Sequence, residues 1–323
     1  MTVTMAAALN TALHDAMRDD DTVVVYGEDV GKLGGVFRVT DGLQAEWGAE
    51  RCFDTPVAES GIVGTAIGMA LYGLRPVVEM QFDGFSYPAL DQVISHVAKY
   101  RNRTRGRAGL PMVIRIPYGG GIGAVEHHSE SPEAYYAHTA GLTVVSPGMP
   151  GDAYSLLRAS IEFDDPVVFL EPKRRYWHKE QIELPVRGEP IGRALVRRTG
   201  TTATLIAYGP MVVTALEAAD AANEHGWDLE VIDVRTLSPL DTDTLAASVT
   251  KTGRAIVVHE APRFAGYGAE IAATLTEQVF GHLAAPVLRV TGFDTPYPPA
   301  KIERHYLPTS DRILDAVAHA LEY

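Results

Sequence analysis

Apolar and polar positions follow two patterns along this chain, helical spacing and short apolar runs, and together they predict alternating helices and strands. Met5, Leu9 and Leu13 recur at helical spacing, and this first helix ends in the acidic run Asp19–Asp21. Shorter apolar runs bounded by turn residues predict strands. In the first half the expected strands cover residues 23–26, 77–82, 112–116, 143–146 and 167–170, and the further helices cover residues 40–48, 59–73, 88–101 and 151–162.

The alternation is interrupted once, over residues 171–200, which are rich in charge and proline and show little periodicity. It then resumes with strands at 203–208, 229–234, 255–259 and 287–291 and helices at 212–225, 241–250 and 268–280. Strands that alternate with helices predict parallel or mixed sheets covered on both faces. We therefore expect an α/β protein of two domains, residues 1–175 and residues 201–323, joined by a connection over residues 176–200.

Size and composition limit the classes of protein that fit this pattern. The 323 residues suffice for two domains of ordinary size. The formal net charge of -13 disfavours a nucleic-acid partner, because an acidic surface repels phosphate. No apolar run approaches the ~20 residues of a membrane-spanning helix, and the N-terminal stretch lacks the basic head of a signal peptide. The only cysteine, Cys52, excludes an internal disulfide, so we expect a cytoplasmic protein with no membrane partner.

Three glycines lie in the helix predicted over residues 59–73, at Gly61, Gly64 and Gly68. Each of them costs about 1 kcal/mol relative to alanine in the interior of a helix. Glycine is useful there when another backbone approaches closely. We therefore expect this helix to pack very close to another segment of backbone.

Glu59 lies where this same helix begins, after an extended segment that contains Pro56. One interpretation is an ordinary first-turn acid, stabilised by the helix dipole by up to about 1 kcal/mol. The other is a half-buried carboxylate at the mouth of a parallel sheet, where α/β proteins bind their ligands. The local sequence taken alone favours the first interpretation.

The stretch TPVAESGIVGTAIGMALYGLRP, which contains Glu59, resembles the signature of the β subunits of 2-oxo acid dehydrogenase complexes. Other blocks resemble the same family, in the same order, over essentially the whole chain: YGEDVGKLGGVFRVT, QFDGFSYPALDQVISHVAKYR, HHSESPEAYYAH, GLTVVSPG, VIDVRTLSPLD, HEAP and GFDTPYPPAKIE. The resemblance implies a transketolase-like fold, in which a pyrimidine-binding domain precedes a smaller C-terminal α/β domain.

By this resemblance, Glu59 matches the glutamate that hydrogen-bonds the aminopyrimidine ring of thiamine diphosphate and so activates the cofactor. Phe85 matches the aromatic residue that packs on the same ring, although an ordinary core or interface aromatic is the alternative. Val57 matches a residue that lines the pocket. Glu28 matches a position near the cofactor and the subunit contact, with a solvated acid at a turn as the alternative.

The pair His127-His128 lies in a loop rich in glycine and polar residues. Neighbouring residues of an extended loop point in opposite directions, so the pair is a poor chelate for one metal ion. The resemblance singles out His128, and implies that it orients and protonates intermediates and assists acyl transfer to a lipoyl group. The ordinary pKa of an imidazole group, about 6.5, suits such proton transfer. His127 receives no role.

The Gly-Asp-Gly motif that holds magnesium and diphosphate in such enzymes does not occur in this chain. Gly151-Asp152-Ala153 lacks the second glycine and the asparagine that follows downstream. The glycine run 119–123 leads into a polar loop, whereas a phosphate cradle leads into a helix. The resemblance therefore implies that an α subunit supplies the Mg²⁺-diphosphate half of the site, in an α₂β₂ heterotetramer.

Relatives also hold a potassium ion, mainly through backbone carbonyl groups. By alignment with their motifs, the candidates in this chain are Val113, Ser160, Phe163 and Asp165. Phe163 stands where an aspartate is common, so a carbonyl ligand survives there and a side-chain ligand does not. The alternative is that these residues only form a strand and the end of a helix.

The implied activity is the decarboxylation of a small 2-oxo acid and the reductive acylation of lipoamide on an acyltransferase core. The motifs SPEAYYAH, FLEPK, HEAP and GFDTPYPP resemble branched-chain enzymes more than pyruvate enzymes. Pyruvate and acetoin dehydrogenase β subunits remain alternatives. A self-sufficient transketolase or synthase is a further alternative, which the missing diphosphate motif disfavours. A non-catalytic assembly subunit is another alternative.

Overall fold

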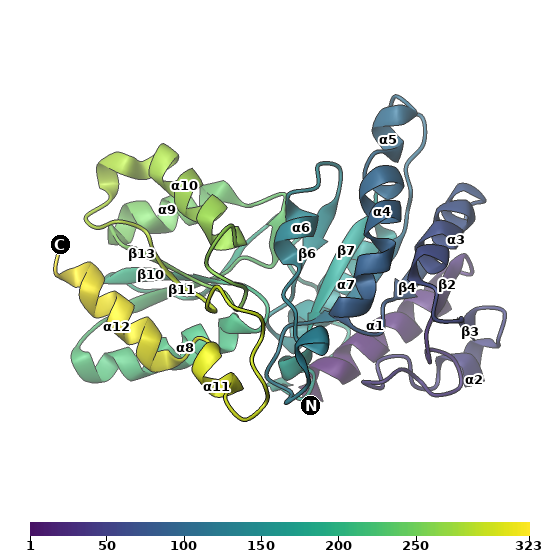
Figure 1. The fold of residues 1–323 in the computed structure, drawn as a ribbon, viewed down its shortest axis with the longest axis horizontal. Helices are drawn as coiled ribbons and strands as arrows, with labels where there is room; N and C mark the ends of the chain where they lie inside the picture. Colours follow the sequence, from purple (N-terminus) through teal and green to yellow (C-terminus); the bar gives the residue numbers. More distant parts are fainter.

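In the computed structural model, which describes residues 1–323, the chain forms two large sheets with helices on both faces of each, and a separate two-stranded sheet (Figure 1). The first sheet has the strand order β12-β6-β7-β5-β4-β2-β3. Its strands are β2 (Val23–Gly27), β3 (Cys52–Asp54), β4 (Arg75–Glu79), β5 (Val113–Tyr118), β6 (Thr143–Val145), β7 (Val167–Pro172) and β12 (Thr236–Ser238). All neighbours pair in parallel except β12, which is antiparallel to β6.

The strands of this sheet are buried on both faces, which is why they appear in the sequence as short, continuous apolar runs. Val23 and Val25 pack into one cluster, together with α1 (Met5–Asp19) and α7 (Pro150–Glu162). Val24 packs into another cluster on the opposite face, which is covered by α3 (Glu59–Leu71). The sequence prediction of a doubly covered sheet is therefore confirmed.

The second sheet has the strand order β14-β13-β10-β11-β9. Its strands are β9 (Leu195–Arg198), β10 (Ala203–Ala207), β11 (Leu229–Asp233), β13 (Ala255–Val258) and β14 (Leu288–Val290). Strand β9 is antiparallel to β11, and the other pairs are parallel. The covering helices are α8 (Met211–Ala221) and α12 (Ser310–Leu321) on one face and α9 (Thr242–Thr252) and α10 (Tyr267–Val279) on the other.

The remaining elements are short. They are β1 (Thr2–Thr4), α2 (Leu43–Trp47), η1 (Asp83–Ala89), α4 (Leu90–Gln92), η2 (Val93–Val97), α5 (Tyr100–Arg103), η3 (Glu126–His128), α6 (Glu133–Ala137), η4 (Lys173–Arg175), β8 (Lys179–Gln181), η5 (Ala222–His225), η6 (Phe280–His282) and α11 (Glu303–Tyr306). None of the helices combines the length and the apolar character that crossing a membrane requires.

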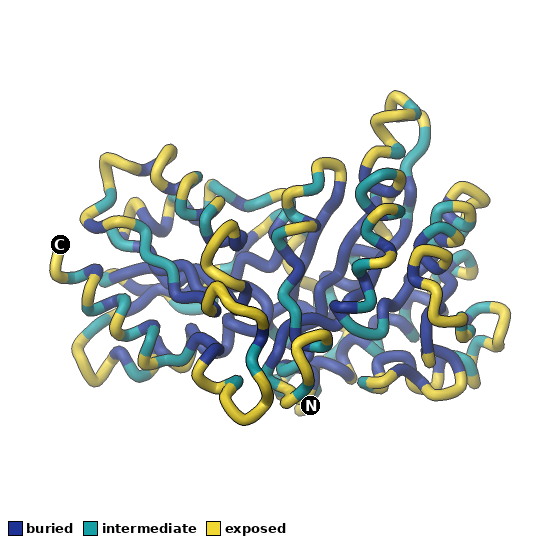
Figure 2. Tube along the Cα trace, in the orientation of Figure 1, coloured by how far each residue is buried: buried dark blue, intermediate teal, exposed yellow.

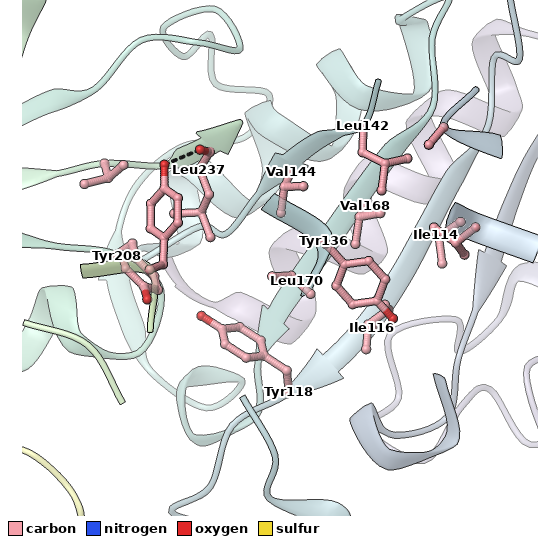
Figure 3. Packing of buried hydrophobic residues seen from close by; sticks show 14 of the residues in the cluster. Ile114, Ile116, Tyr118, Tyr136, Leu142, Val144, Val168, Leu170, Tyr208 and Leu237 are labelled. Carbon is pink, nitrogen blue, oxygen red and sulfur yellow. Dashed lines mark hydrogen bonds between the residues drawn. The ribbon is translucent and has the colours of Figure 1, made fainter. Parts of the chain in front are cut away.

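One hydrophobic cluster runs across both halves of the chain. It joins Tyr118 and Tyr136 of the first half to Tyr208 and Leu237 of the second (Figure 3). Figure 2 shows the same continuity, because buried segments extend from one sheet into the other. Strand β12 adds to it, since it comes from the second half of the sequence and pairs in the first sheet. The two halves are thus fixed to each other by a shared core.

The single helix predicted over residues 88–101 is wrong. Pro88 lies inside the 3-10 turn η1, and η2 is a π-helical stretch in which Ala98 N donates to Val93 O at 2.9 Å. The apolar spacing is similar in α-, π- and 3-10 turns, so the pattern does not reveal where one turn type replaces another.

The segment expected to be only a connection contributes strands to two sheets. Strand β8 pairs with β1 at the start of the chain, and β9 forms the edge of the second sheet. These pairings join distant residues and leave little periodicity in the segment itself. The sequence pattern therefore could not reveal them.

The glycines of α3 do not approach another backbone within this chain. A Cβ atom at Gly68 would meet no atom within 4 Å, and one at Gly64 would lie 3.7 Å from the Gln92 side chain. Gly61 and Gly68 are exposed. The expected close packing is thus wrong for this chain's own backbone, and α3 presents its small residues to the exterior.

Candidate active site

Three parallel strands end together at one edge of the first sheet. Gly27, the last residue of β2, pairs with Asp54 of β3 on one side and with Glu79 of β4 on the other. Glu28 follows β2 directly, and Glu59 is the first residue of α3 after β3. The carboxyl ends of parallel strands are the usual ligand-binding edge of an α/β sheet. The fold therefore brings two glutamates from separate motifs to that edge.

Glu28 and Glu59 are both buried, with 3% and 6% of their surface exposed. No N–H or O–H donor of the chain binds either carboxylate oxygen of Glu28, whose polar neighbour is the Glu59 carboxylate. Burial, followed by the neighbouring Glu59 carboxylate, raises the pKa of Glu28 to about 7. A buried carboxyl group without a partner is costly. The pair is therefore suited to a ligand that brings hydrogen-bonding groups to this edge.

Aromatic rings lie beside the start of α3. The turn η1 packs against α3 on one side and against η3 on the other. The His128 ring stacks on Phe82 with a centroid distance of 4.2 Å and an interplanar angle of 13°. Phe85 meets the same imidazole edge-on at 5.3 Å. Phe85 and His128, which are far apart in the sequence, thus belong to one aromatic cluster with Phe82.

Val57 lies in the segment between β3 and α3, and 75% of its surface is exposed. Phe85 is half-buried. Both side chains therefore remain available to another molecule. Their expected contact with a ligand stays a prediction.

The two neighbouring histidines do not point apart, as an extended loop would require. They lie in the 3-10 turn η3, where His128 N donates to Val125 O at 3.0 Å. Their ring centroids are 5.4 Å apart, and both rings contact Phe85. Local hydrogen bonding has replaced the extended conformation on which the expectation rested. No group of three or more His, Cys, Asp or Glu in this chain could hold a metal ion.

A buried ion pair that was not predicted from the sequence lies next to Phe82. Lys173 Nζ donates to Asp83 Oδ1 at 2.8 Å and to the backbone carbonyl of His128 at 2.7 Å. The side chains of Lys173 and Asp83 are completely buried. The available signal was a lysine directly after the buried strand β7, because a buried lysine requires a partner.

A second group of buried carboxylates lies next to this edge, and it is bound by a buried arginine. Arg115 donates to Glu171 Oε1 at 2.7 Å and Oε2 at 2.9 Å, and to Glu79 Oε2 at 2.6 Å. The Tyr176 hydroxyl also donates to Glu171. These carboxylates belong to the framework of the sheet.

The chain matches two family models, "Transketolase, pyrimidine binding domain" over residues 1–178 and "Transketolase, C-terminal domain" over residues 192–313. The 3-methyl-2-oxobutanoate dehydrogenase subunit beta of Mycobacterium tuberculosis is 58% identical, over 99% of this chain and 92% of the relative. The pyruvate dehydrogenase E1 component subunit beta of Leifsonia xyli is 54% identical, over 99% and 95%. The 2-oxoisovalerate dehydrogenase subunit beta of Pseudomonas aeruginosa is 47% identical, over 99% and 95%.

The chain belongs to the family of 2-oxo acid dehydrogenase β subunits. This confirms the resemblance inferred from the motifs. A solved structure described as a split gene transketolase, an inactive beta4 tetramer, superposes with a TM-score of 0.83 over 99% of this chain and 98% of that one. At 24% identity it shows the fold alone, and the transketolase-like fold is thereby confirmed.

In this β-subunit family member, the glycine run binds the second half of its own chain. Gly121 N donates to Tyr297 Oη at 3.0 Å and to Glu303 Oε2 at 3.1 Å, and Gly120 N donates to Glu260. A Cβ atom at Gly120 would lie 1.9 Å from Tyr297 Oη. The amide groups that could have cradled a phosphate are thus directed at carboxylates of the HEAP and GFDTPYPPAKIE motifs.

Asp152, the acid of the incomplete diphosphate motif, is likewise engaged. Arg235 Nε donates to Asp152 Oδ1 at 2.8 Å, and the Arg197 guanidinium forms a second ion pair with the same carboxylate. The residue lies in the first turn of α7 and is buried. In this β-subunit family member it is a structural acid.

The four candidate potassium ligands lie where α7 ends and where β5 and β7 begin. Val113 pairs with Val167 of β7, and the Ser160 hydroxyl donates to Leu156 O at 2.6 Å. The Phe163 carbonyl accepts a hydrogen bond from Arg75 Nη1 at 3.1 Å. The Asp165 carboxylate accepts one from Arg101. Two of the four positions thus already have a cationic partner, and the potassium site stays a prediction.

Proposed function

We propose that this chain is the β subunit of a thiamine diphosphate-dependent branched-chain 2-oxo acid dehydrogenase, and that it binds the pyrimidine end of the cofactor. The observation that carries the proposal is the buried pair Glu28 and Glu59 at the ligand edge of the sheet, where Glu28 has no partner in the chain. Thiamine diphosphate, when bound, supplies the carbon nucleophile and the electron sink for decarboxylation.

The residues of this chain then have distinct tasks. Glu59 holds a proton at a ring nitrogen of the aminopyrimidine, and Glu28, whose pKa is raised to about 7, is a protonatable neighbour within the same buried pair. Phe85 and Val57 contact the ring and keep water away from it. The His128 ring is held by stacking on Phe82, and no residue of the chain hydrogen-bonds its buried Nδ1. The imidazole is thus not engaged by another side chain, and we assign it proton transfer during acylation of lipoamide.

The substrate class follows from the relatives. The relatives at 58% and 47% identity are named for 3-methyl-2-oxobutanoate and 2-oxoisovalerate, two names for the same branched-chain 2-oxo acid. The relative at 54% identity is named for pyruvate, which makes pyruvate the second candidate. The motif comparison also favours the branched-chain type, with acetoin as a remaining alternative. A β subunit that only supports assembly would not require an unpaired acidic pair.

An α subunit completes the site in this proposal and holds Mg²⁺ and the diphosphate, in an α₂β₂ heterotetramer. Asp152 and the amide groups of the glycine run are engaged within the chain, so they do not provide such a site. The exposed glycines of α3 offer a surface on which a helix of a partner chain could pack closely. A lipoyl-bearing acyltransferase core accepts the acyl group, and we place the assembly in the cytoplasm.

The test is co-expression with an α subunit from the same organism and assay of the purified complex. Decarboxylation of 3-methyl-2-oxobutanoate and of pyruvate is measured side by side, together with the chain alone. We expect kcat/KM to favour the branched substrate by about ten-fold or more, the size of one or two well-placed methyl contacts. A preference for pyruvate would support the second candidate. Turnover by the chain alone would refute the shared site.

A further inference from the structure

The ammonium group of Lys173 joins three elements of the first domain. Lys173 follows β7 directly, its Nζ atom binds Asp83 at the start of η1, and it binds the carbonyl of His128 at the end of η3. The same Nζ lies 5.4 Å from the centroid of the Phe82 ring. Because the side chain is completely buried, these contacts are not shared with water.

These contacts determine where the His128 ring lies. Phe82 contacts both groups: its ring centroid lies 5.4 Å from the Lys173 ammonium, and the imidazole stacks on it at 4.2 Å. The carbonyl of His128 is fixed by the lysine, and the turn before it passes so close to η1 that a Cβ at Gly84 would lie 2.2 Å from His127 O. The imidazole itself makes no hydrogen bond within the chain that would orient it. Its orientation therefore depends on the backbone that the lysine holds and on the packing of Phe82 and Phe85.

We propose that Lys173 is a positioning residue for acyl transfer: it holds the backbone carbonyl of His128 and thereby sets the imidazole in its reactive orientation. The proposal rests on the proposed function, in which His128 serves the acylation of lipoamide. Lys173 should therefore affect the acylation of lipoamide more than decarboxylation, because the lysine acts through the histidine.

A purely structural role for the lysine makes a different prediction. Asp83 is buried, and its second carboxylate oxygen has no hydrogen-bond partner, so the ammonium could serve only to neutralise this acid. In that case any change that removes both charges would restore function. If the lysine positions His128, removing both charges restores stability alone, because the carbonyl still lacks its donor.

The first measurement uses Lys173→Met in the assembled α₂β₂ enzyme, since methionine keeps an unbranched chain of similar length. Two rates are compared, decarboxylation with an artificial electron acceptor and reductive acylation of a free lipoyl domain. We expect the acylation rate to fall about ten- to hundred-fold more than the decarboxylation rate, as a small misplacement of a catalytic group does. Equal losses in the two rates would overturn the proposal.

The second measurement uses the double variant Lys173→Met/Asp83→Asn, which removes the unpaired carboxylate. We expect its melting temperature to rise back toward that of the wild type while acylation stays impaired. Full recovery of acylation would assign the lysine a structural role only. The matched control is Lys251→Met, which takes the ammonium away from the buried Glu230 in the C-terminal half. It should lower the melting temperature without changing the ratio of the two rates.

The third measurement combines Lys173→Met with His128→Ala. If the lysine acts through the histidine, its loss adds less than about two-fold to the effect of His128→Ala on acylation. Losses that multiply would show that Lys173 acts elsewhere, and would overturn this proposal while the role of His128 stands. Unchanged acylation in His128→Ala alone would remove the histidine from the mechanism, and both proposals would fall together.

Discussion

Two groups of buried carboxylates lie side by side at one edge of the first sheet, and their surroundings differ. Glu79 and Glu171 share the Arg115 guanidinium through three hydrogen bonds of 2.6 to 2.9 Å. Glu28 and Glu59 have no such cation, and both oxygens of Glu28 lack a partner in the chain. The pairs have similar burial, yet only one of them is satisfied by the fold.

The difference distinguishes carboxylates that stabilise the fold from carboxylates that are available to a ligand. A buried charge that is paired and hydrogen-bonded belongs to the framework, and breaking the pair destabilises the protein. A buried acid without partners makes the folded chain less stable, and a ligand that supplies the missing partner offsets this cost. The arginine-bound group thus stabilises the sheet, and the group without a cation is the one we propose for the ligand.

The largest effect is expected for Glu59→Gln. The amide keeps the shape of the side chain but does not hold a proton at the pyrimidine, so turnover of the assembled enzyme should fall about 10²- to 10⁴-fold. Proton exchange at the thiazolium carbon, followed by NMR, should fall in parallel, while circular dichroism stays unchanged. Near-normal exchange in this variant would end the assignment of Glu59.

Arg115→Met should affect the stability of the folded chain, not the chemistry at the candidate site. It leaves Glu79 and Glu171 buried without their cation, and we expect a loss of about 3–5 kcal/mol in the free energy of unfolding. Urea unfolding followed by fluorescence measures this loss. A loss below 1 kcal/mol would mean that the two pairs do not differ in the way proposed.

Gly120→Ala tests a third group of carboxylates, those of Glu260 and Glu303, which accept hydrogen bonds from backbone amide groups of the glycine run. The new Cβ would lie 1.9 Å from Tyr297 Oη and would displace the second half of the chain from the glycine run. We expect a loss of about 1–3 kcal/mol in stability. Gly281→Ala is the matched control, because a Cβ there would meet no atom within 4 Å. Equal melting temperatures for the two variants would contradict the contact.

Glu28→Gln should make stability less dependent on pH. The folded state keeps Glu28 protonated up to a pKa of about 7, whereas the ordinary value is 4.5. The folded chain therefore binds more protons than the unfolded chain in this interval, and stability falls as the pH rises from 4.5 through about 7. After allowance for solvent screening, the glutamine variant should be more stable by about 1 kcal/mol at pH 8. Urea unfolding at pH 5 and pH 8 compares the two proteins.

The smallest effect is expected for potassium. The Phe163 carbonyl already accepts from Arg75, so an added cation would have to share it. Replacing sodium by potassium should raise the free energy of unfolding by no more than about 1 kcal/mol, in proportion to the logarithm of its concentration. Thermal melts of the assembled enzyme in the two salts measure it. A rise of more than ten degrees would show a stronger site than these contacts support.

Much of the fold could be predicted from periodicity, because both sheets are buried on both faces and their strands are short apolar runs between amphipathic helices. The failures occurred where pairing is remote or turn types change. Strand β12 could not be assigned to the first sheet, since its partner β6 lies far away in the sequence. The π-helical stretch η2 and the turn η3 differ from an α-helix or an extended loop only in their hydrogen bonds.

The functional groups of the candidate site could be identified from the sequence alone: a glutamate at the start of a glycine-containing helix, a second glutamate after a strand, an aromatic residue and a histidine. The family motifs attached an expected role to each of them. Only the tertiary structure decided which acids are left without a partner, and that the Lys173 ammonium reaches the His128 carbonyl. The physical reason is that burial and pairing depend on contacts between residues far apart in the chain, which no local pattern contains.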